Sequence, residues 1–138
     1  MDAVVRGDLA SLKHLLSLGA DVNEPDFDGM TALHWAAASE EGSELVEELV
    51  KSGADIEVKT PKGYTPLHLH CVKGRYYAVC CLLHYGAKVN ARTDSTLTPL
   101  HIAVCREHVD ISRVLLAYGA KIAAPSEDLK LRLNALIS

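Results

Sequence analysis

A four-residue phrase occurs three times in this chain at nearly constant spacing and limits what the chain can fold into. It reads Thr-Ala-Leu-His from Thr31 and Thr-Pro-Leu-His from Thr65 and Thr98, so successive copies begin 34 and 33 residues apart. The dipeptide Gly-Ala keeps almost the same interval, with gaps of 34, 33 and 33 residues between its four copies. Two independent markers with one period predict stacked repeats. Stacked repeats bind through extended surfaces, so a binding surface is expected rather than a catalytic pocket.

The composition fits one small helical domain. Hydrophobic residues make up 49% of the 138 residues and aromatic residues only 5%, a balance that suits thin helical layers. No apolar run approaches the roughly 18–20 residues of a membrane helix, and the N-terminus lacks the pattern of a secretory signal. The four cysteines show no C-x-x-C spacing and are expected to be reduced thiols. We therefore expect a cytoplasmic or nuclear protein.

The net charge of −4 conceals an asymmetry along the chain. Residues 1–57 contain 13 acidic and 3 basic side chains, whereas residues 58–138 contain 5 acidic and 11 basic ones. In a linear stack this asymmetry becomes a charge gradient along the long axis. The gradient predicts a partner protein with a basic segment over repeats 1–2 and an acidic one over repeats 3–4. The acidic half argues against nucleic acid, and we expect a monomer that does not bind membranes.

Residues 65–97 show what one repeat contains. Thr65 can cap a helix whose first position is Pro66, where a missing N–H costs nothing. A second helix is expected from about Tyr76 to Tyr85, ended by a left-handed Gly86. The remaining residues form a projecting loop with a turn. Helices this short need neighbouring copies to bury their apolar faces.

On the strength of these residues, the chain resembles the ankyrin-repeat family. The resemblance rests on the three phrases and on Gly-Ala-Asp-Val-Asn from Gly19 and Gly-Ala-Lys-Val-Asn from Gly86. It implies an all-α solenoid of helix–turn–helix units with projecting β-hairpin-like fingers, which binds other proteins through its fingers and inner helices. One domain is expected, with a truncated N-terminal repeat (1–28), three repeats (29–62, 63–95 and 96–125) and a C-terminal capping helix (126–138).

Three departures from the repeat pattern are visible. Thr96 stands where Gly29 and Gly63 make the finger turn, and a β-branched residue resists positive φ, so another turn geometry is expected there. His70 replaces an alanine that both neighbouring repeats carry at a tightly packed position. One extra residue near Ala38–Gly42 is expected to lengthen the loop between the helices of the second repeat.

Histidine and cysteine side chains are the candidate metal ligands. The resemblance gives the histidines of the phrase (His34, His68 and His101) a structural hydrogen-bonding role. Zinc held by residues among His70, Cys71, Cys80, Cys81 and His84 is the alternative, but their spacing does not favour it. Buried small hydrophobes are the expected role of Cys71 and Cys81, and Cys105 is the expected reactive thiol. We predict no metal and no cofactor.

Motifs of catalysis are absent from the sequence. There is no G-x-x-x-x-G-K-[ST], no H-E-x-x-H and no G-x-S-x-G. A protein that is not an enzyme is therefore expected. The main hypothesis is a non-catalytic recognition module, either an adaptor or the recognition part of a larger protein.

The expected binding surface combines the concave side of the inner helices with the finger tips, because positions i, i+3 and i+4 share a helix face. Trp35 is either a half-buried spacer between repeats or a partner contact. Phe27 lies in a polar turn, so it is either an exposed anchor or is tucked against a neighbouring finger. The predicted partner-binding residues are Phe27, Asp28, Met30, Trp35, Ser39, Glu40, Glu41, Lys62, Tyr64, Lys73, Leu97 and Arg106.

Two alternative functions remain open at this point. Asn23 and Asn90 each follow a valine and lie eight residues after a leucine, which resembles ankyrin asparagines that an oxygen-sensing hydroxylase modifies. The domain would then be the substrate of a modifying enzyme. The other alternative is a regulatory domain with a metal or redox site formed by cysteine and histidine.

Overall fold

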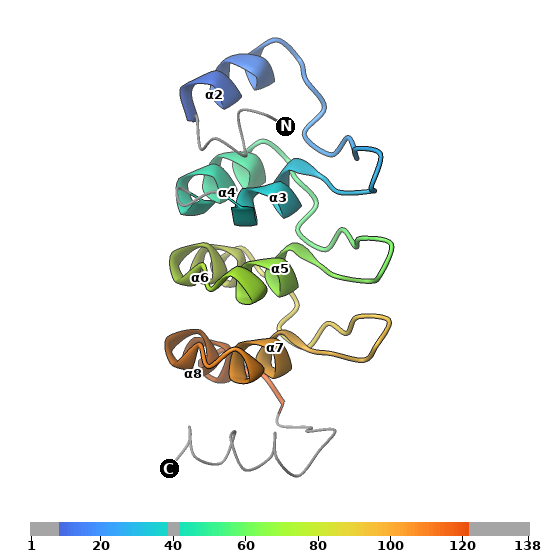
Figure 1. Ribbon diagram of the computed structural model, residues 1–138. Coiled ribbons are helices and arrows are strands. Elements are labelled where there is room, and N and C mark those ends of the chain that lie inside the picture. Colours follow the sequence, from blue (N-terminus) through green and yellow to red (C-terminus); the bar gives the residue numbers. More distant parts are fainter. Residues whose placement is uncertain (1–8, 39–41, 122–138) are drawn as a thin grey trace.

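A computed structural model describes residues 9–38 and 42–121 of the chain. These residues form pairs of antiparallel helices that stack along one axis, with loops projecting from one side (Figure 1). No strand is present in the described ranges. This confirms the expected all-α ankyrin-type stack. The predicted capping helix at 126–138 and the start of the truncated first repeat lie outside the described residues.

Inner and outer helices alternate along the chain. The inner helices lie nearer the loops and the outer ones on the opposite side (Figure 1). The inner helices are α3 (Ala32–Trp35), continued by the 3-10 turn η1 (Ala36–Ala38), α5 (Pro66–Lys73) and α7 (Pro99–Cys105). The outer helices are α2 (Leu9–Ser17), α4 (Gly42–Lys51), α6 (Tyr76–His84) and α8 (Val109–Ala117).

The repeated phrase fixes where inner helices begin. Thr65 and Thr98 are extended N-cap residues, and their hydroxyl oxygens accept hydrogen bonds from the backbone N–H three residues on, in His68 and His101. Pro66 and Pro99 occupy the first helical turn, where their missing N–H is not needed. The caps expected from the sequence are therefore confirmed.

The hydrophobic core runs continuously through the stack. Equivalent leucines of the phrase, Leu33, Leu67 and Leu100, are almost completely buried in one cluster with residues from the outer helices. Because each two-helix layer has apolar side chains on both sides, every repeat depends on its neighbours for burial. The core therefore supplies a scaffold and leaves function to the surface.

Projecting loops, here called fingers, are each closed by the same backbone hydrogen bond. In each finger an N–H donates to the carbonyl four residues on: Asp26 to Met30, Thr60 to Tyr64 and Thr93 to Leu97. The Asp94 N–H also donates to the Lys62 carbonyl at 3.1 Å, which joins the second and third repeats. The fingers thus form one row along the stack (Figure 1).

The turn at Thr96 corrects an expectation from the sequence. Thr96 has φ 65°, and its N–H donates to the Thr93 carbonyl at 2.9 Å. Gly29 and Gly63 have φ 76° and 85° and make the same hydrogen bond to Asp26 and Thr60. The expectation of a different turn was therefore wrong. Hydrogen bonds along the finger hold Thr96 in a conformation that a β-branched side chain disfavours.

Replacing Thr96 by glycine should stabilise the protein. Relief of the left-handed backbone gains about 1–2 kcal/mol, and the extra freedom of glycine in the unfolded chain takes back about 0.5–1 kcal/mol. We expect a net gain of about 0.5–1 kcal/mol in the free energy of unfolding, measured by urea denaturation. Ser95→Gly is the matched control, because it adds the freedom of glycine without relieving a positive φ. Equal losses in both variants would contradict the strain at Thr96.

The second repeat differs from its neighbours at the end of its inner helix. There α3 spans four residues before the chain tightens into η1, whereas α5 and α7 span eight and seven. Side chains from the third repeat hold this end: His70 Nε2–H donates to the Leu33 carbonyl at 3.3 Å and Arg75 Nε–H to the Ala37 carbonyl at 3.0 Å. The large side chain at the alanine position therefore ties two repeats together. The predicted longer loop falls on residues 39–41, outside the described ranges.

Candidate protein-binding surface

Asp26 organises the first described finger. Its Oδ1 accepts hydrogen bonds from the backbone N–H of Asp28 at 2.9 Å and of Met30 at 3.0 Å. Its Oδ2 accepts the indole N–H of Trp35 at 2.6 Å. These hydrogen bonds lower the pKa of the Asp26 carboxyl below its ordinary value, and the bond from Met30 has the largest effect. The finger is thus held by an ionised side chain and presents its tip to solvent.

Phe27 lies at the tip of this finger and is fully exposed. The alternative in which its ring tucks against a neighbouring finger is therefore wrong. The reason is that Asp26 uses its carboxylate to close the turn around Phe27, which leaves the ring in solvent. Asp28 beside it is also exposed. An isolated exposed phenylalanine between two carboxylates is available to a partner.

Trp35 has a structural attachment in addition to its partial exposure. The indole packs against the core cluster, is half-buried, and donates its N–H to the finger through Asp26. Both interpretations of this residue remain compatible with the geometry, since the ring supports the finger and is also partly open to solvent. Its contact with a partner stays a prediction.

Met30, Tyr64 and Leu97 occupy equivalent places at the bases of the three fingers. All three are half-buried, and Tyr64 and Leu97 pack against the core. The Tyr64 ring also makes an edge-on contact with the His68 imidazole, with 5.9 Å between ring centroids. These residues therefore form an apolar base between the fingers and the inner helices, in contrast to the free Phe27 side chain.

The predicted basic positions are accessible. Lys62 lies on the finger that ends the second repeat, and Lys73 and Arg106 lie at the ends of α5 and α7; all three side chains are exposed. None of them forms an ion pair within the part of the chain that is described; the ion pair found there joins Lys51 and Glu47. The predicted contacts Ser39, Glu40 and Glu41 fall outside the described residues.

The three histidines of the phrase hydrogen-bond their capping threonines, and His34 and His68 also connect their repeats to the next. In His34 and His68, Nδ1 accepts the N–H of the capping threonine at 3.1 Å. Nε2 then carries the proton and donates to carbonyls of the following finger: Val58 and Tyr64 for His34, and Leu97 for His68. His101 Nδ1 likewise accepts the Thr98 N–H at 3.2 Å. Their expected structural role is confirmed.

The four cysteines are free thiols that differ in burial. Cys71 is buried in the core, Cys80 and Cys81 are half-buried, and Cys105 is exposed. Burial raises the pKa of the Cys71 and Cys81 thiols, which makes both less reactive. Within residues 9–38 and 42–121 no three His, Cys, Asp or Glu side chains converge as metal ligands would. The core role expected for Cys71 is confirmed, and Cys105 remains the predicted reactive thiol.

The two asparagines that resemble hydroxylation sites use their carboxamides to join repeats. Asn23 donates to the Gly53 carbonyl at 3.1 Å and accepts the Asp55 N–H at 2.7 Å. Asn90 donates to the Gly119 carbonyl at 3.3 Å and accepts the Lys121 N–H at 2.8 Å. This structural use accounts for an asparagine at both places without a modification. Hydroxylation stays a prediction, which the intact mass of the protein from its native cell would test.

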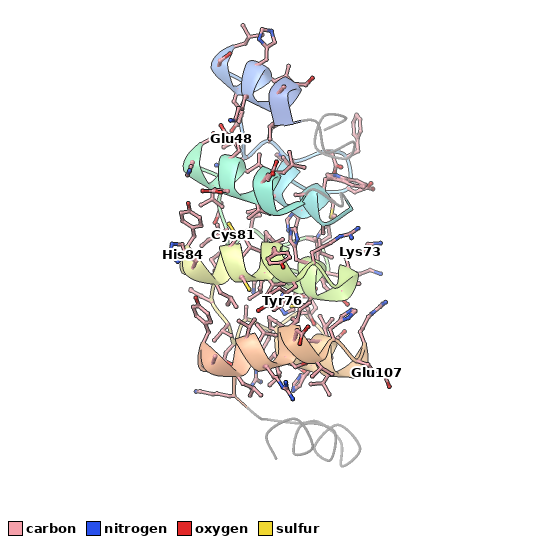
Figure 2. All side chains as sticks on the ribbon, turned by 90° about the vertical axis from the view of Figure 1, so that its left-hand side faces the viewer. Glu48, Lys73, Tyr76, Cys81, His84 and Glu107 are labelled. Atoms are coloured by element: carbon pink, nitrogen blue, oxygen red, sulfur yellow. The ribbon has the colours of Figure 1, made fainter. Side chains whose placement is uncertain are left out.

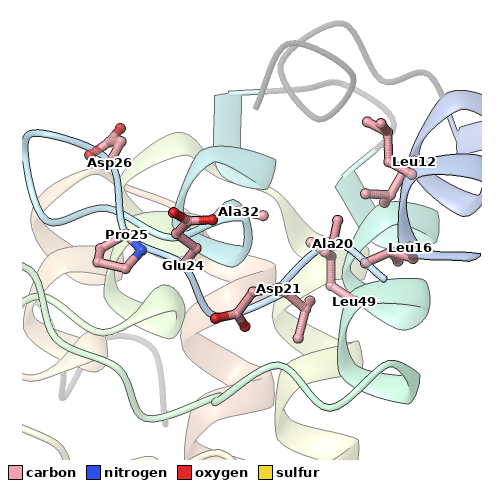
Figure 3. Close-up of a pocket in the computed structure, with 11 residues that line it drawn as sticks. Leu12, Leu16, Ala20, Asp21, Glu24, Pro25, Asp26, Ala32 and Leu49 are labelled. Carbon is pink, nitrogen blue, oxygen red and sulfur yellow. The ribbon is translucent and has the colours of Figure 1, made fainter. Parts of the chain in front are cut away.

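A pocket of about 280 Å³ opens between the first and second repeats (Figure 3). Its apolar wall includes Leu12, Leu16 and Leu49, and acidic side chains such as Asp21 and Glu24 lie along it. Side chains of α2, of the loop that follows it, and of α3 and α4 together line the pocket.

Sequence reasoning missed a group of exposed tyrosines on the outer side. Tyr76, Tyr77, Tyr85 and Tyr118 all expose at least 36% of their surface. A signal was present, because Tyr85 and Tyr118 each directly precede a Gly-Ala pair, a place where the helix has ended. The periodic pattern of buried residues does not mark these positions.

A family model for ankyrin repeats in three copies matches residues 1–93 and 37–126. The chain belongs to the ankyrin-repeat family. Ankyrin repeats are generally modules for protein–protein interaction and generally lack catalytic activity. Among the described helices, none is both long and apolar enough to cross a bilayer.

Several curated proteins are similar over part of the chain. Ankyrin repeat domain-containing protein 40 from Homo sapiens is 41% identical over 69 residues, which cover 49% of this chain and 18% of that protein. Potassium channel AKT1 from Arabidopsis thaliana is 39% identical over 67 residues, 49% of this chain and 8% of the channel. Palmitoyltransferase Hip14 from Drosophila melanogaster is 33% identical over 78 residues, 56% of this chain and 12% of the enzyme. The chain thus spans less than a fifth of each of these relatives.

Proposed function

We propose that this chain is a non-catalytic recognition module that binds a partner protein through its finger row and the adjoining ends of its inner helices. The observation that carries the proposal is the fully exposed Phe27 at the tip of a finger held rigid by Asp26. An aromatic ring on a preorganised turn gives contact area at little entropic cost. Met30, Tyr64 and Leu97 would extend the apolar contact along the row.

Charge on this surface would orient the partner. Asp26 and Asp28 flank Phe27 at the end of the first repeat, whereas Lys62, Lys73 and Arg106 are exposed on the second, third and fourth. A partner segment would match both groups if its basic residues lay over Asp26 and Asp28 and its acidic residues lay over the three cations. Ser39, Glu40 and Glu41 would enlarge the acidic end. We expect binding to weaken as salt is added, because exposed charges are screened.

Phe27→Ser should remove partners without changing the fold, because the exposed ring is not part of the core. Proteins captured from the native cell by the wild type would be identified, and the affinity of one of them measured by titration calorimetry. Loss of a buried aromatic contact costs about 2 kcal/mol, which corresponds to roughly 30-fold weaker binding. A double variant, Lys73→Glu with Arg106→Glu, should also weaken it and alter its salt dependence.

Leu18→Ser is the matched control, since it removes another exposed large apolar side chain, one that directly follows an outer helix on the opposite side of the stack. Circular dichroism would establish that all variants are folded. If the partners bind Phe27→Ser and the double charge variant as tightly as the wild type, the finger row is not the recognition surface. A partner lost with Leu18→Ser alone would lead to the same conclusion.

A further inference from the structure

Large apolar side chains that remain exposed are concentrated on the outer side of the stack, away from the fingers. Eight such residues occur in the described part of the chain, and seven lie on an outer helix or directly after one; the eighth is Phe27. The outer helices are on the opposite side from the fingers (Figure 1) and face the viewer in Figure 2. The seven are Leu15, Leu18, Tyr76, Tyr77, Tyr85, Val109 and Tyr118.

Tyrosines of the third repeat form the centre of this side. Tyr76 and Tyr77 begin α6, and their rings meet edge-on with 5.3 Å between centroids. Tyr77 is 75% exposed, although an aromatic ring of this size normally contributes to a core. Tyr77, Cys81 and Tyr85 follow one another at intervals of four residues, which places them along one face of α6 and its end. The ring pair is therefore a fixed aromatic platform open to solvent.

Carboxylates flank the platform on both sides. On α4, which packs against α6, Glu44 and Glu47 are exposed and Glu48 is half-buried. Glu47 forms its ion pair with Lys51 on this helix, 2.9 Å apart. On the other side, Asp110 is exposed in the first turn of α8, which also packs against α6. The platform thus lies between acidic groups from the second and fourth repeats.

Few cations balance these carboxylates. Helices α4, α6 and α8 contain four acidic residues and two basic ones, Lys51 and Arg113. Lys51 pairs with Glu47, since its Nζ lies 2.9 Å from Glu47 Oε1. Within the described ranges Glu44, Glu48 and Asp110 form no ion pair, so the outer side combines exposed tyrosine rings with unpaired carboxylates.

We propose that the outer tyrosine surface, defined by Tyr76, Tyr77, Tyr85, Glu44 and Glu47, is a second binding surface for an arginine- or lysine-bearing segment of a partner protein. A guanidinium or ammonium group gains from the face of a tyrosine ring and from a nearby carboxylate at once. The aliphatic stem of the same side chain covers apolar surface such as the Tyr77 ring. This surface is separate from the finger row, so the two sides would hold different segments.

The test is selection of peptides from a random phage-displayed library on the intact chain, followed by titration of synthetic peptides from the selected sequences. We expect peptides enriched in arginine and lysine whose affinity falls as salt is added. Tyr77→Ser should weaken their binding about tenfold, and the double variant Glu44→Lys with Glu47→Lys should weaken it at least as much. These side chains are exposed, so folding is expected to be unaffected, as circular dichroism would establish.

Two control variants establish that the basic peptides bind at the outer tyrosine surface. Leu18→Ser removes an exposed apolar side chain from the first repeat and Phe27→Ser removes the finger tip; neither should alter binding of the basic peptides. The proposal is overturned if no peptides are selected, if those selected lack basic residues, or if Phe27→Ser abolishes their binding and Tyr77→Ser does not. It is also overturned if sedimentation shows that the wild type self-associates and Tyr77→Ser does not, since the occupant would then be a second copy.

Discussion

His68→Ala is expected to lower the free energy of unfolding by about 4 kcal/mol. His68 is completely buried, with Nδ1 3.1 Å from the Thr65 nitrogen and Nε2 3.0 Å from the Leu97 oxygen. Alanine leaves the Thr65 N–H unpaired, at about 1–3 kcal/mol, and leaves a cavity. It also removes one of two hydrogen bonds to the Leu97 carbonyl, which still accepts the Thr93 N–H. This loss is a large fraction of the roughly 5–15 kcal/mol that stabilises a typical domain.

Urea denaturation of both proteins at neutral pH would measure this loss. His84→Ala is the matched control, because His84 is exposed on α6 in the same repeat and its removal should change stability by less than about 0.5 kcal/mol. A loss at position 68 no greater than at position 84 would show that the cap and the bond between repeats contribute little. Because each layer supports the next, we also expect the third and fourth repeats to separate first in the variant.

Acid should destabilise the protein through His70, and His70→Ala should remove that part of the pH dependence. Burial lowers the pKa of the His70 imidazole from 6.5 to about 4, and the positive charge of Arg75 acts in the same direction. Its Nε2 is bonded to Leu33, whereas its Nδ1 is buried without a partner. A second proton would therefore place a charge in the core.

The direction of the change in stability with pH follows from whether the folded or the unfolded chain binds the proton. Above pH 6.5 the imidazole is neutral in both the folded and unfolded chain, and its contribution to stability does not depend on pH. Below pH 6.5 the unfolded chain binds a proton that the folded chain does not bind until the pH is near 4. Stability is therefore lost as the pH falls from 6.5 toward 4, by about 1.4 kcal/mol per unit and about 3 kcal/mol in total.

The measurement is the free energy of unfolding at several pH values between about 7.5 and about 4.5. Burial also lowers the pKa of His34 and His68, so these residues add acid sensitivity of the same sign to both proteins. The contribution of His70 is the difference between wild type and His70→Ala in the slope of the free energy of unfolding against pH. The cavity in the variant lowers that free energy by the same amount at every pH. Parallel pH profiles would contradict a buried neutral imidazole at this position.

Much of the fold was predictable because its signals are local. A threonine followed by proline specifies the start of a helix by its own hydrogen bond and its missing donor, as Thr65 and Thr98 do. A glycine after an apolar helix specifies the end, as Gly86 does with φ 94°. A repeat with one period then has one way to bury its apolar faces, against copies of itself.

Where the sequence failed, contacts between repeats decided the outcome. Thr96 by itself disfavours positive φ, but the finger hydrogen bonds and the stacked neighbour impose that conformation. His70 replaces an alanine without any local sign of its role, which is to bond the carbonyl of Leu33, 37 residues away in another repeat. Only folding brings such partners together.

The surface also divides into features set by local sequence and features set by contacts between repeats. From the sequence, Phe27 was an aromatic residue in a polar turn with two possible positions; the carboxylate of Asp26 closes the turn and leaves the ring in solvent. The sequence by itself determined the repeat, its caps and its core, because spacing and local hydrogen bonding specify them. Only the tertiary structure decided which aromatic side chains are covered, because exposure depends on what the neighbouring layers leave open.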